Sequence, residues 1–204
     1  CLGSSFPTAI YWGEDLTLLY NDAWAPIPAE RHPWALGRPG AEVWADIWEV
    51  VGPQFSEVMR TGEGFAAYDQ LLLMERNGIP TETWWNYSCT PIIGEDGRVA
   101  GIFNQGNETT ERVLGERRAA LLLELGDRMR AVTGPDRIAE VAAEVIGQHL
   151  KVDRVGYATI TDDVEIAWNA PDWTAGDVDS ALGSHRIADY GQGFAAALRR
   201  GELV

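Results

Sequence analysis

Residues 81–112, TETWWNYSCTPIIGEDGRVAGIFNQGNETTER, decide the fold of the first half of this chain. They predict two strands, over 81–93 and 98–108, joined by a turn at Asp96-Gly97. The second strand passes through 107–112 (NETTER) directly into a charged helix that carries several leucines. A sheet strand that continues into an amphipathic helix can pass strain from a pocket to whatever follows. This stretch therefore predicts a sensor.

The residues before this stretch predict the rest of an antiparallel sheet. Further strands are predicted over 9–12, 16–20 and 65–74. Asn77-Gly78 is a hairpin signal because both residues tolerate positive φ. The proline-rich segment 25–40 predicts a loop, and apolar residues over 41–59 recur at helical spacing, with a break into two helices expected at Gly52-Pro53. The expected fold is α+β, a five-stranded antiparallel sheet with short helices on one side.

The segment 112–132 predicts a connecting signalling helix. Four apolar residues on it are spaced by 3, 4 and 3, the rhythm of a coiled-coil seam: Leu122, Leu125, Met129 and Val132. This spacing favours a homodimer held along the helix. An ordinary amphipathic helix that packs on its own domain is the alternative, and the two stay open.

A second domain is predicted from residue 134 onwards. Thr133 is the expected helix cap and Pro135 suits the first helical turn. A helix over 138–150 should be followed by strands over 155–160 and 164–168. A loop over 171–184 and a helix over 190–200 are expected to complete the chain. The predicted domains are 1–111, a linker helix over 112–133, and 134–204.

Composition excludes several classes of function. The 204 residues carry a net charge of -15, which disfavours nucleic acid and anionic membranes as partners. No apolar run approaches the roughly 18 residues of a membrane span, so a cytoplasmic protein is expected. The chain opens at Cys1 rather than at a methionine, and we expect it to be an excised fragment. Cys1 and Cys89 are too few and too separated to predict a disulfide framework or a zinc site, and no other metal site is expected.

Residues 1–112 resemble a PAS domain. Residues 9–12 (AIYW) with 18–24 (LLYNDAW) resemble its first hairpin and following turn, and residues 36–39 (LGRP) with 42–44 (EVW) resemble its "G+…E+W" segment. Residues 90–102 (TPIIGEDGRVAGI) resemble its "S-P-I-x-D-x-x-G-x-v-x-G" hairpin. Residues 108–112 (ETTER) stand where the family has "D-I-T-E-R", with Glu108 in place of the usual aspartate.

Residues 138–158 resemble the opening of a GAF domain, including 152–158 (VDRVGYA), and only the N-terminal part of such a domain is present. Together the two resemblances imply the input region of a bacterial signalling protein, most often a dimeric sensor histidine kinase, with the kinase itself absent. They imply a regulatory module rather than an enzyme. The partners expected from them are a second copy, a downstream kinase or other output domain, and a small-molecule ligand. A ligand-free dimerisation and relay module is the alternative.

The PAS resemblance also implies a ligand pocket on the concave face of the sheet. Side chains along 83–91 alternate, and the family pattern turns Trp85, Tyr87 and Cys89 inward. The residues expected to complete the pocket are Ile102, Asn104, Trp44 and Trp48. Such an aromatic pocket suits a flat or apolar molecule, or is filled by its own side chains. No cofactor is evident: the cysteine motif of the flavin-binding PAS subtype is missing, and haem would have only His32 as an axial ligand.

Overall fold

The computed structural model describes residues 3–176 and 178–202. The chain divides into two compact units, Cys1–Leu114 (unit 1) and Gly115–Val204 (unit 2). Cys89 is free and buried in unit 1, whereas Cys1 lies outside the described residues. Within the described part of the chain, no helix has the length and hydropathy needed to cross a membrane.

Unit 1 is built on a five-stranded antiparallel sheet in the order β2-β1-β5-β4-β3. Its strands are β1 (Thr8–Trp12), β2 (Thr17–Tyr20), β3 (Phe65–Arg76), β4 (Ile79–Ile93) and β5 (Val99–Glu108). The Asn77-Gly78 turn has φ values of 52° and 74°, as the sequence predicts. This architecture confirms the expected α+β sheet and is consistent with a PAS-like fold.

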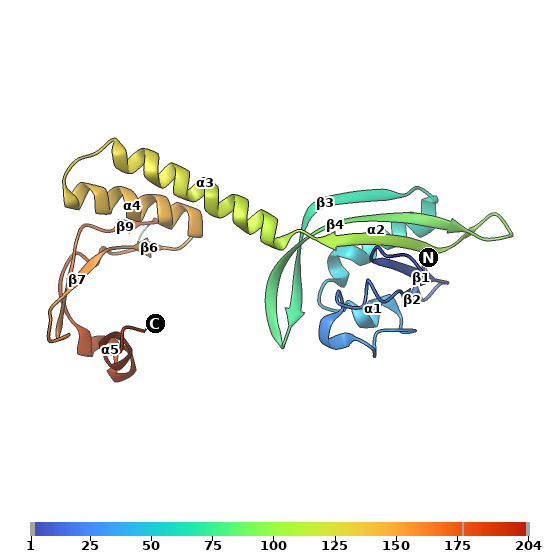
Figure 1. Ribbon diagram of the computed structural model, residues 1–204, viewed down its shortest axis with the longest axis horizontal. Coiled ribbons are helices and arrows are strands. Elements are labelled where there is room, and N and C mark those ends of the chain that lie inside the picture. The colour runs from blue at the N-terminus through green and yellow to red at the C-terminus, as the bar shows by residue number, and fades with distance from the viewer. Residues whose placement is uncertain (1–2, 177, 203–204) are drawn as a thin grey trace. The chain divides into compact units, whose positions relative to one another are not determined.

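Short helices cover one face of the sheet (Figure 1). They are η1 (Ala29–Arg31), α1 (Gly40–Val43) and α2 (Trp48–Thr61). The predicted break at Gly52-Pro53 is wrong, because Pro53 lies inside α2 and the chain interrupts the helix earlier, between Val43 and Trp48. Gly52 makes room for the Trp48 indole, since a Cβ there would lie 2.8 Å from its Nε1. The helix nevertheless continues through this pair of residues.

The core of unit 1 lies between the sheet and these helices. Strand alternation directs Leu18, Tyr11, Ile102, Cys89 and Leu72 into it, one from each strand, and all five are buried. From the helical side it receives Val43, Trp44, Val51, Phe55 and Val58. Burial of each large apolar side chain contributes about 1.5–3 kcal/mol, so this contact is the main source of stability for unit 1.

Helix α3 (Thr110–Arg130) begins in unit 1 and continues into unit 2. It ends two residues short of Val132, so the prediction that Val132 belongs to a seam on this helix is wrong. The backbone N–H groups of Ala131 and Val132 reach back only three residues, to Arg128 and Met129, and Gly134 then turns the chain at φ 93°. The tightened last turn and this glycine end the helix.

In unit 2, α3 is followed by α4 (Pro135–Leu150), with Pro135 in its first turn as predicted. Thr133 does not cap it, because the cap residue is Gly134, and no side-chain cap hydrogen bond is present there among the described residues. The remaining elements are short: β6 (Arg154–Val155), β7 (Ala158–Ile160), β8 (Ile166–Asn169), β9 (Trp173–Thr174), β10 (Gly183–Arg186), η2 (Ile187–Tyr190) and α5 (Gln192–Arg199).

The strands of unit 2 form two small antiparallel sheets, β10-β8-β7 and β6-β9. The single strand expected over 155–160 is divided, because Val155 pairs with Trp173 in one sheet and Ala158 pairs with Asn169 in the other. The segment 171–184, expected as a loop, contains β9 and the start of β10 for the same reason. Such pairings are set by distant partners and leave little trace in local sequence.

Candidate functional site

A cavity of about 60 Å³ lies in unit 1 between the sheet and the helices. The residues that line it are Tyr11, Trp24, Ile27, Trp44, Ile47, Val51, Phe55, Leu72, Met74, Trp85, Tyr87, Asn104 and Gly106. They come from four of the five strands, from α2, from the loop before η1 and from the segment between α1 and α2. Unit 1 therefore has a partly open aromatic cavity where its sheet meets its helices.

Four of the seven residues predicted for the pocket line this cavity: Trp44, Trp85, Tyr87 and Asn104. The other three lie nearby without lining it. Cys89 and Ile102 are fully buried in the core. Trp48 is partly buried, and its ring meets Phe55 edge-on at 6.0 Å between centroids.

The pairing of β4 with β5 determines which of their residues face the cavity. Cys89 lies opposite Asn104 and Tyr87 lies opposite Gly106, so these four positions share the inner face. Gly106 brings the two strands together closely, since a Cβ there would lie 2.8 Å from the Tyr87 Cβ. The aromatic ring of Tyr87 thereby forms part of the cavity wall.

Several polar groups of the cavity residues are bonded within unit 1. The indole N–H of Trp44 donates to the hydroxyl of Tyr11 at 2.8 Å, and the indole N–H of Trp85 donates to Thr83 Oγ1 at 2.8 Å. The Tyr87 hydroxyl donates to Gln54 Oε1 at 2.6 Å. These bonds fix three of the aromatic walls in place.

The titratable groups of this region are held neutral. Burial raises the pKa of Tyr11 well above its ordinary value and raises the pKa of Tyr87 to about 12. Burial also raises the pKa of the Cys89 thiol to about 12, against the opposing effect of the hydrogen bond from Asn104. Among the described residues that line the cavity none is charged. The site therefore suits a neutral molecule.

Sequence reasoning missed most of the cavity wall. Tyr11, Trp24, Phe55, Leu72 and Met74 line it but were not among the predicted site residues. The alternation of β1 and β3 would have marked Tyr11 and Leu72 as inward residues. Trp24 stands in a non-repetitive segment whose side-chain direction follows no period. His32 does not line the cavity, and its Nδ1 lies 2.9 Å from the Tyr20 hydroxyl.

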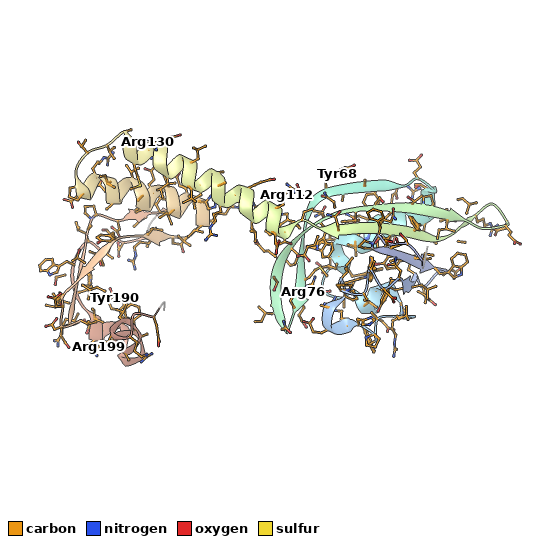
Figure 2. All side chains as sticks on the ribbon, viewed as in Figure 1. Tyr68, Arg76, Arg112, Arg130, Tyr190 and Arg199 are labelled. Atoms are coloured by element: carbon orange, nitrogen blue, oxygen red, sulfur yellow. The ribbon has the colours of Figure 1, made fainter. Side chains whose placement is uncertain are left out.

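The junction between β5 and α3 is held by hydrogen bonds on both sides. Thr109, the one residue between the two elements, is buried, and its backbone N–H donates to the Trp84 carbonyl at 2.7 Å. The Trp84 backbone N–H donates in turn to Thr110 Oγ1 at 3.0 Å. The Thr109 hydroxyl donates to Asp69 Oδ1 at 2.8 Å. Figure 2 marks Arg112, which follows this junction on α3.

The predicted seam residues on α3 differ in exposure. Leu122 is 59% exposed, whereas Leu125 and Met129 are half-buried. Within unit 2, Arg128 of α3 donates to Glu144 of α4 at 2.6 Å, and the two helices run alongside each other (Figure 1). Leu122 is thus the most accessible of the predicted seam residues on this helix.

No family model and no curated protein matches the chain. An RNA-binding light-oxygen-voltage receptor is similar to it with a TM-score of 0.46 and 17% identity, over 60% of this chain and 35% of that one. A PAS domain from Colwellia psychrerythraea is similar with a TM-score of 0.40 and 17% identity, over 51% of this chain and 87% of that one. A sensory box sensor histidine kinase from Vibrio cholerae is similar with a TM-score of 0.38 and 15% identity, over 52% of this chain and 80% of that one. The chain spans about a third of the length of the light-oxygen-voltage receptor.

Proposed function

We propose that this chain is the sensory input region of a bacterial signal-transduction protein, in which the state of the unit 1 cavity is relayed through β5 to α3. One observation carries the proposal. Asn104 and Gly106 of β5 line the cavity, and β5 ends at Glu108 while α3 begins at Thr110. A displacement of this cavity wall therefore reaches the helix through one intervening residue.

The size of the cavity supplies the physical basis for switching. A cavity of about 150 Å³ holds benzene, so a ring-sized ligand enters a space of about 60 Å³ only by moving a wall. Such a ligand prefers the displaced arrangement, and this preference is what shifts a conformational equilibrium. A shift from 1:99 to 99:1 requires about 5.5 kcal/mol of preference.

Gly106→Ala tests the relay without a ligand. The added methyl group would lie 2.8 Å from the Tyr87 Cβ and must displace β5 from β4. Hydrogen exchange of the backbone amides over 111–118 should then change. Gly3→Ala is the matched control, because its methyl group enters open space. Altered exchange confined to β4 and β5 would argue against a relay into α3.

The ligand-free relay is the second candidate, and the small cavity volume favours it. In that case the aromatic side chains fill the core and the module works by protein contacts alone. Native mass spectrometry of the purified protein separates the two candidates. An adduct lost on denaturation supports small-molecule sensing, whereas a dimer without an adduct supports the relay.

The wider assignments belong to the same proposal. We propose a regulatory module without catalysis of its own, located in the cytoplasm and acting as a homodimer on a downstream kinase or other output domain. The segment 134–204 would be the N-terminal part of a GAF-like domain. Its helix α4 and small antiparallel sheets support that assignment. Proteolysis of the purified chain would show whether this segment folds without further residues.

A further inference from the structure

Two buried polar groups on the cavity wall each keep an unused hydrogen-bonding position. Tyr11 is 2% exposed, and its hydroxyl oxygen accepts the Trp44 indole N–H. The proton of that hydroxyl has no acceptor among the described residues. Because burial raises the pKa of Tyr11, the hydroxyl keeps this proton at neutral pH. One hydrogen-bond donor is therefore available on the wall.

The second group is the side-chain amide of Asn104, which is 7% exposed. Its Nδ2 donates to the Ser88 carbonyl at 3.1 Å and approaches Cys89 Sγ at 3.5 Å. A carbonyl oxygen only accepts, so this bond determines which end of the amide is nitrogen. Asn104 Oδ1 has no donor in the described part of the chain. It is an available acceptor on the same wall.

Strand pairing places Tyr11 and Asn104 on the same face of the sheet. Tyr11 lies opposite Ile102, and Asn104 lies two residues further along β5, opposite Ala9. The Cα atoms of diagonal neighbours of this kind on one face of a sheet are roughly 7–8 Å apart. One small molecule placed between the two side chains is therefore within reach of both. Both residues line the cavity, whose remaining wall is predominantly apolar and aromatic.

We infer that the cavity recognises a small, flat, neutral molecule that carries both a carbonyl oxygen and an N–H group, as a lactam does. Its oxygen accepts the Tyr11 hydroxyl proton, and its N–H donates to Asn104 Oδ1. This inference rests on the proposed sensory function and specifies the ligand class. A ligand that lacks either group leaves Tyr11 or Asn104 without that partner, and an unpaired buried polar group costs binding free energy.

Three flat six-membered rings test the inference on the full chain. The probe 2-pyridone carries both groups, N-methyl-2-pyridone lacks the N–H, and benzene lacks both. Binding at millimolar concentration is measured by saturation-transfer NMR and by the shift of the thermal unfolding midpoint. Native protein should prefer 2-pyridone over N-methyl-2-pyridone by about three- to tenfold, the contribution of one net hydrogen bond.

Variants assign the preference to the two residues. Asn104→Leu should abolish the preference for 2-pyridone over its N-methyl derivative. Tyr11→Phe should reduce the preference for 2-pyridone over benzene by about three- to tenfold. Tyr68→Phe is the matched control, because it removes a hydroxyl from a side chain that is 80% exposed and does not line the cavity. Because the test compares two probes on one variant, a loss of overall stability does not imitate the result.

Each other outcome overturns the inference. Equal binding of the three rings would show that the cavity selects by shape alone. Absence of binding by all three to the folded protein would exclude the lactam class. In both cases the relay proposal is tested separately, by the hydrogen exchange of the α3 backbone amides in Gly106→Ala.

Discussion

Asp69 and Arg112 form an ion pair that joins the middle of β3 to the first turn of α3. Asp69 stands in a β-bulge, where the pairing of β3 with β4 shifts between Ala67 and Gln70, and its φ is 47°. Its backbone N–H donates to Asn86 Oδ1 at 2.7 Å. The bulge thereby presents one carboxylate to both Arg112 and Thr109 at the start of the helix.

The Asp69 carboxylate should make the junction sensitive to acid. Hydrogen bonds from Arg112 and then Thr109 lower its pKa below the ordinary value. Because the folded-state pKa is the lower one, this stabilisation is complete above the unfolded-state pKa and is lost as pH falls through the folded-state value. In Asp69→Asn, the free energy of unfolding should therefore fall less as the pH is lowered through this range. Urea unfolding at a series of pH values measures it. Asp22→Asn, an exposed position away from the junction, should leave it unchanged.

Truncation of Tyr87 should destabilise unit 1. Tyr87→Ala removes a half-buried ring that meets Phe65 edge-on at 5.9 Å, and we expect a loss of about 3 kcal/mol. Tyr87→Phe removes only the bond to Gln54 and should cost about 1 kcal/mol. Urea unfolding measures both. Tyr68→Ala, at an exposed position, should change stability little. An equal effect at Tyr87 and Tyr68 would contradict the assignment of Tyr87 to the cavity wall.

A dimer seam on α3 should depend on Leu122. Leu122→Glu places a charge on the predicted seam, at a position 59% exposed, and should lower self-association without unfolding the chain. Leu123→Glu is the control, because Leu123 is 67% exposed but lies about 100° around the helix. Sedimentation velocity reports the mass in solution. The same mass for both variants and the native chain would remove the seam from the proposal.

Unit 2 should be sensitive to an added methyl group at Gly147. A Cβ there would lie 2.1 Å from the Trp173 ring, so α4 and β9 cannot keep their present spacing. Gly147→Ala should destabilise this unit by about 1–3 kcal/mol. Gly193→Ala meets open space and should not. The unfolding transition is followed by the change in Trp173 fluorescence. A transition in Gly147→Ala that is the same as in the native chain would argue against this contact.

The sequence alone determined the elements whose signals are local. Positive φ at Asn77-Gly78 permits the hairpin, and alternation along β4 places Trp85, Tyr87 and Cys89 on one face. The resemblance to a PAS domain, not the alternation, implied that this face is the inner one. The continuation of β5 into α3 can also be predicted from residues 107–112, because this segment contains no proline or glycine. These features depend on backbone sterics and on a side-chain period of two, which act between near neighbours.

Only the tertiary structure decided what depends on distant partners. The bulge at Asp69 brings a carboxylate to Thr109, forty residues away in the chain. The donor of Tyr11 and the acceptor of Asn104 lie on one cavity wall because β1 pairs with β5 across the sheet. The end of α3 before Val132 likewise follows from its last turn and Gly134 rather than from apolar spacing. Packing and strand pairing, which join residues far apart in sequence, set these positions.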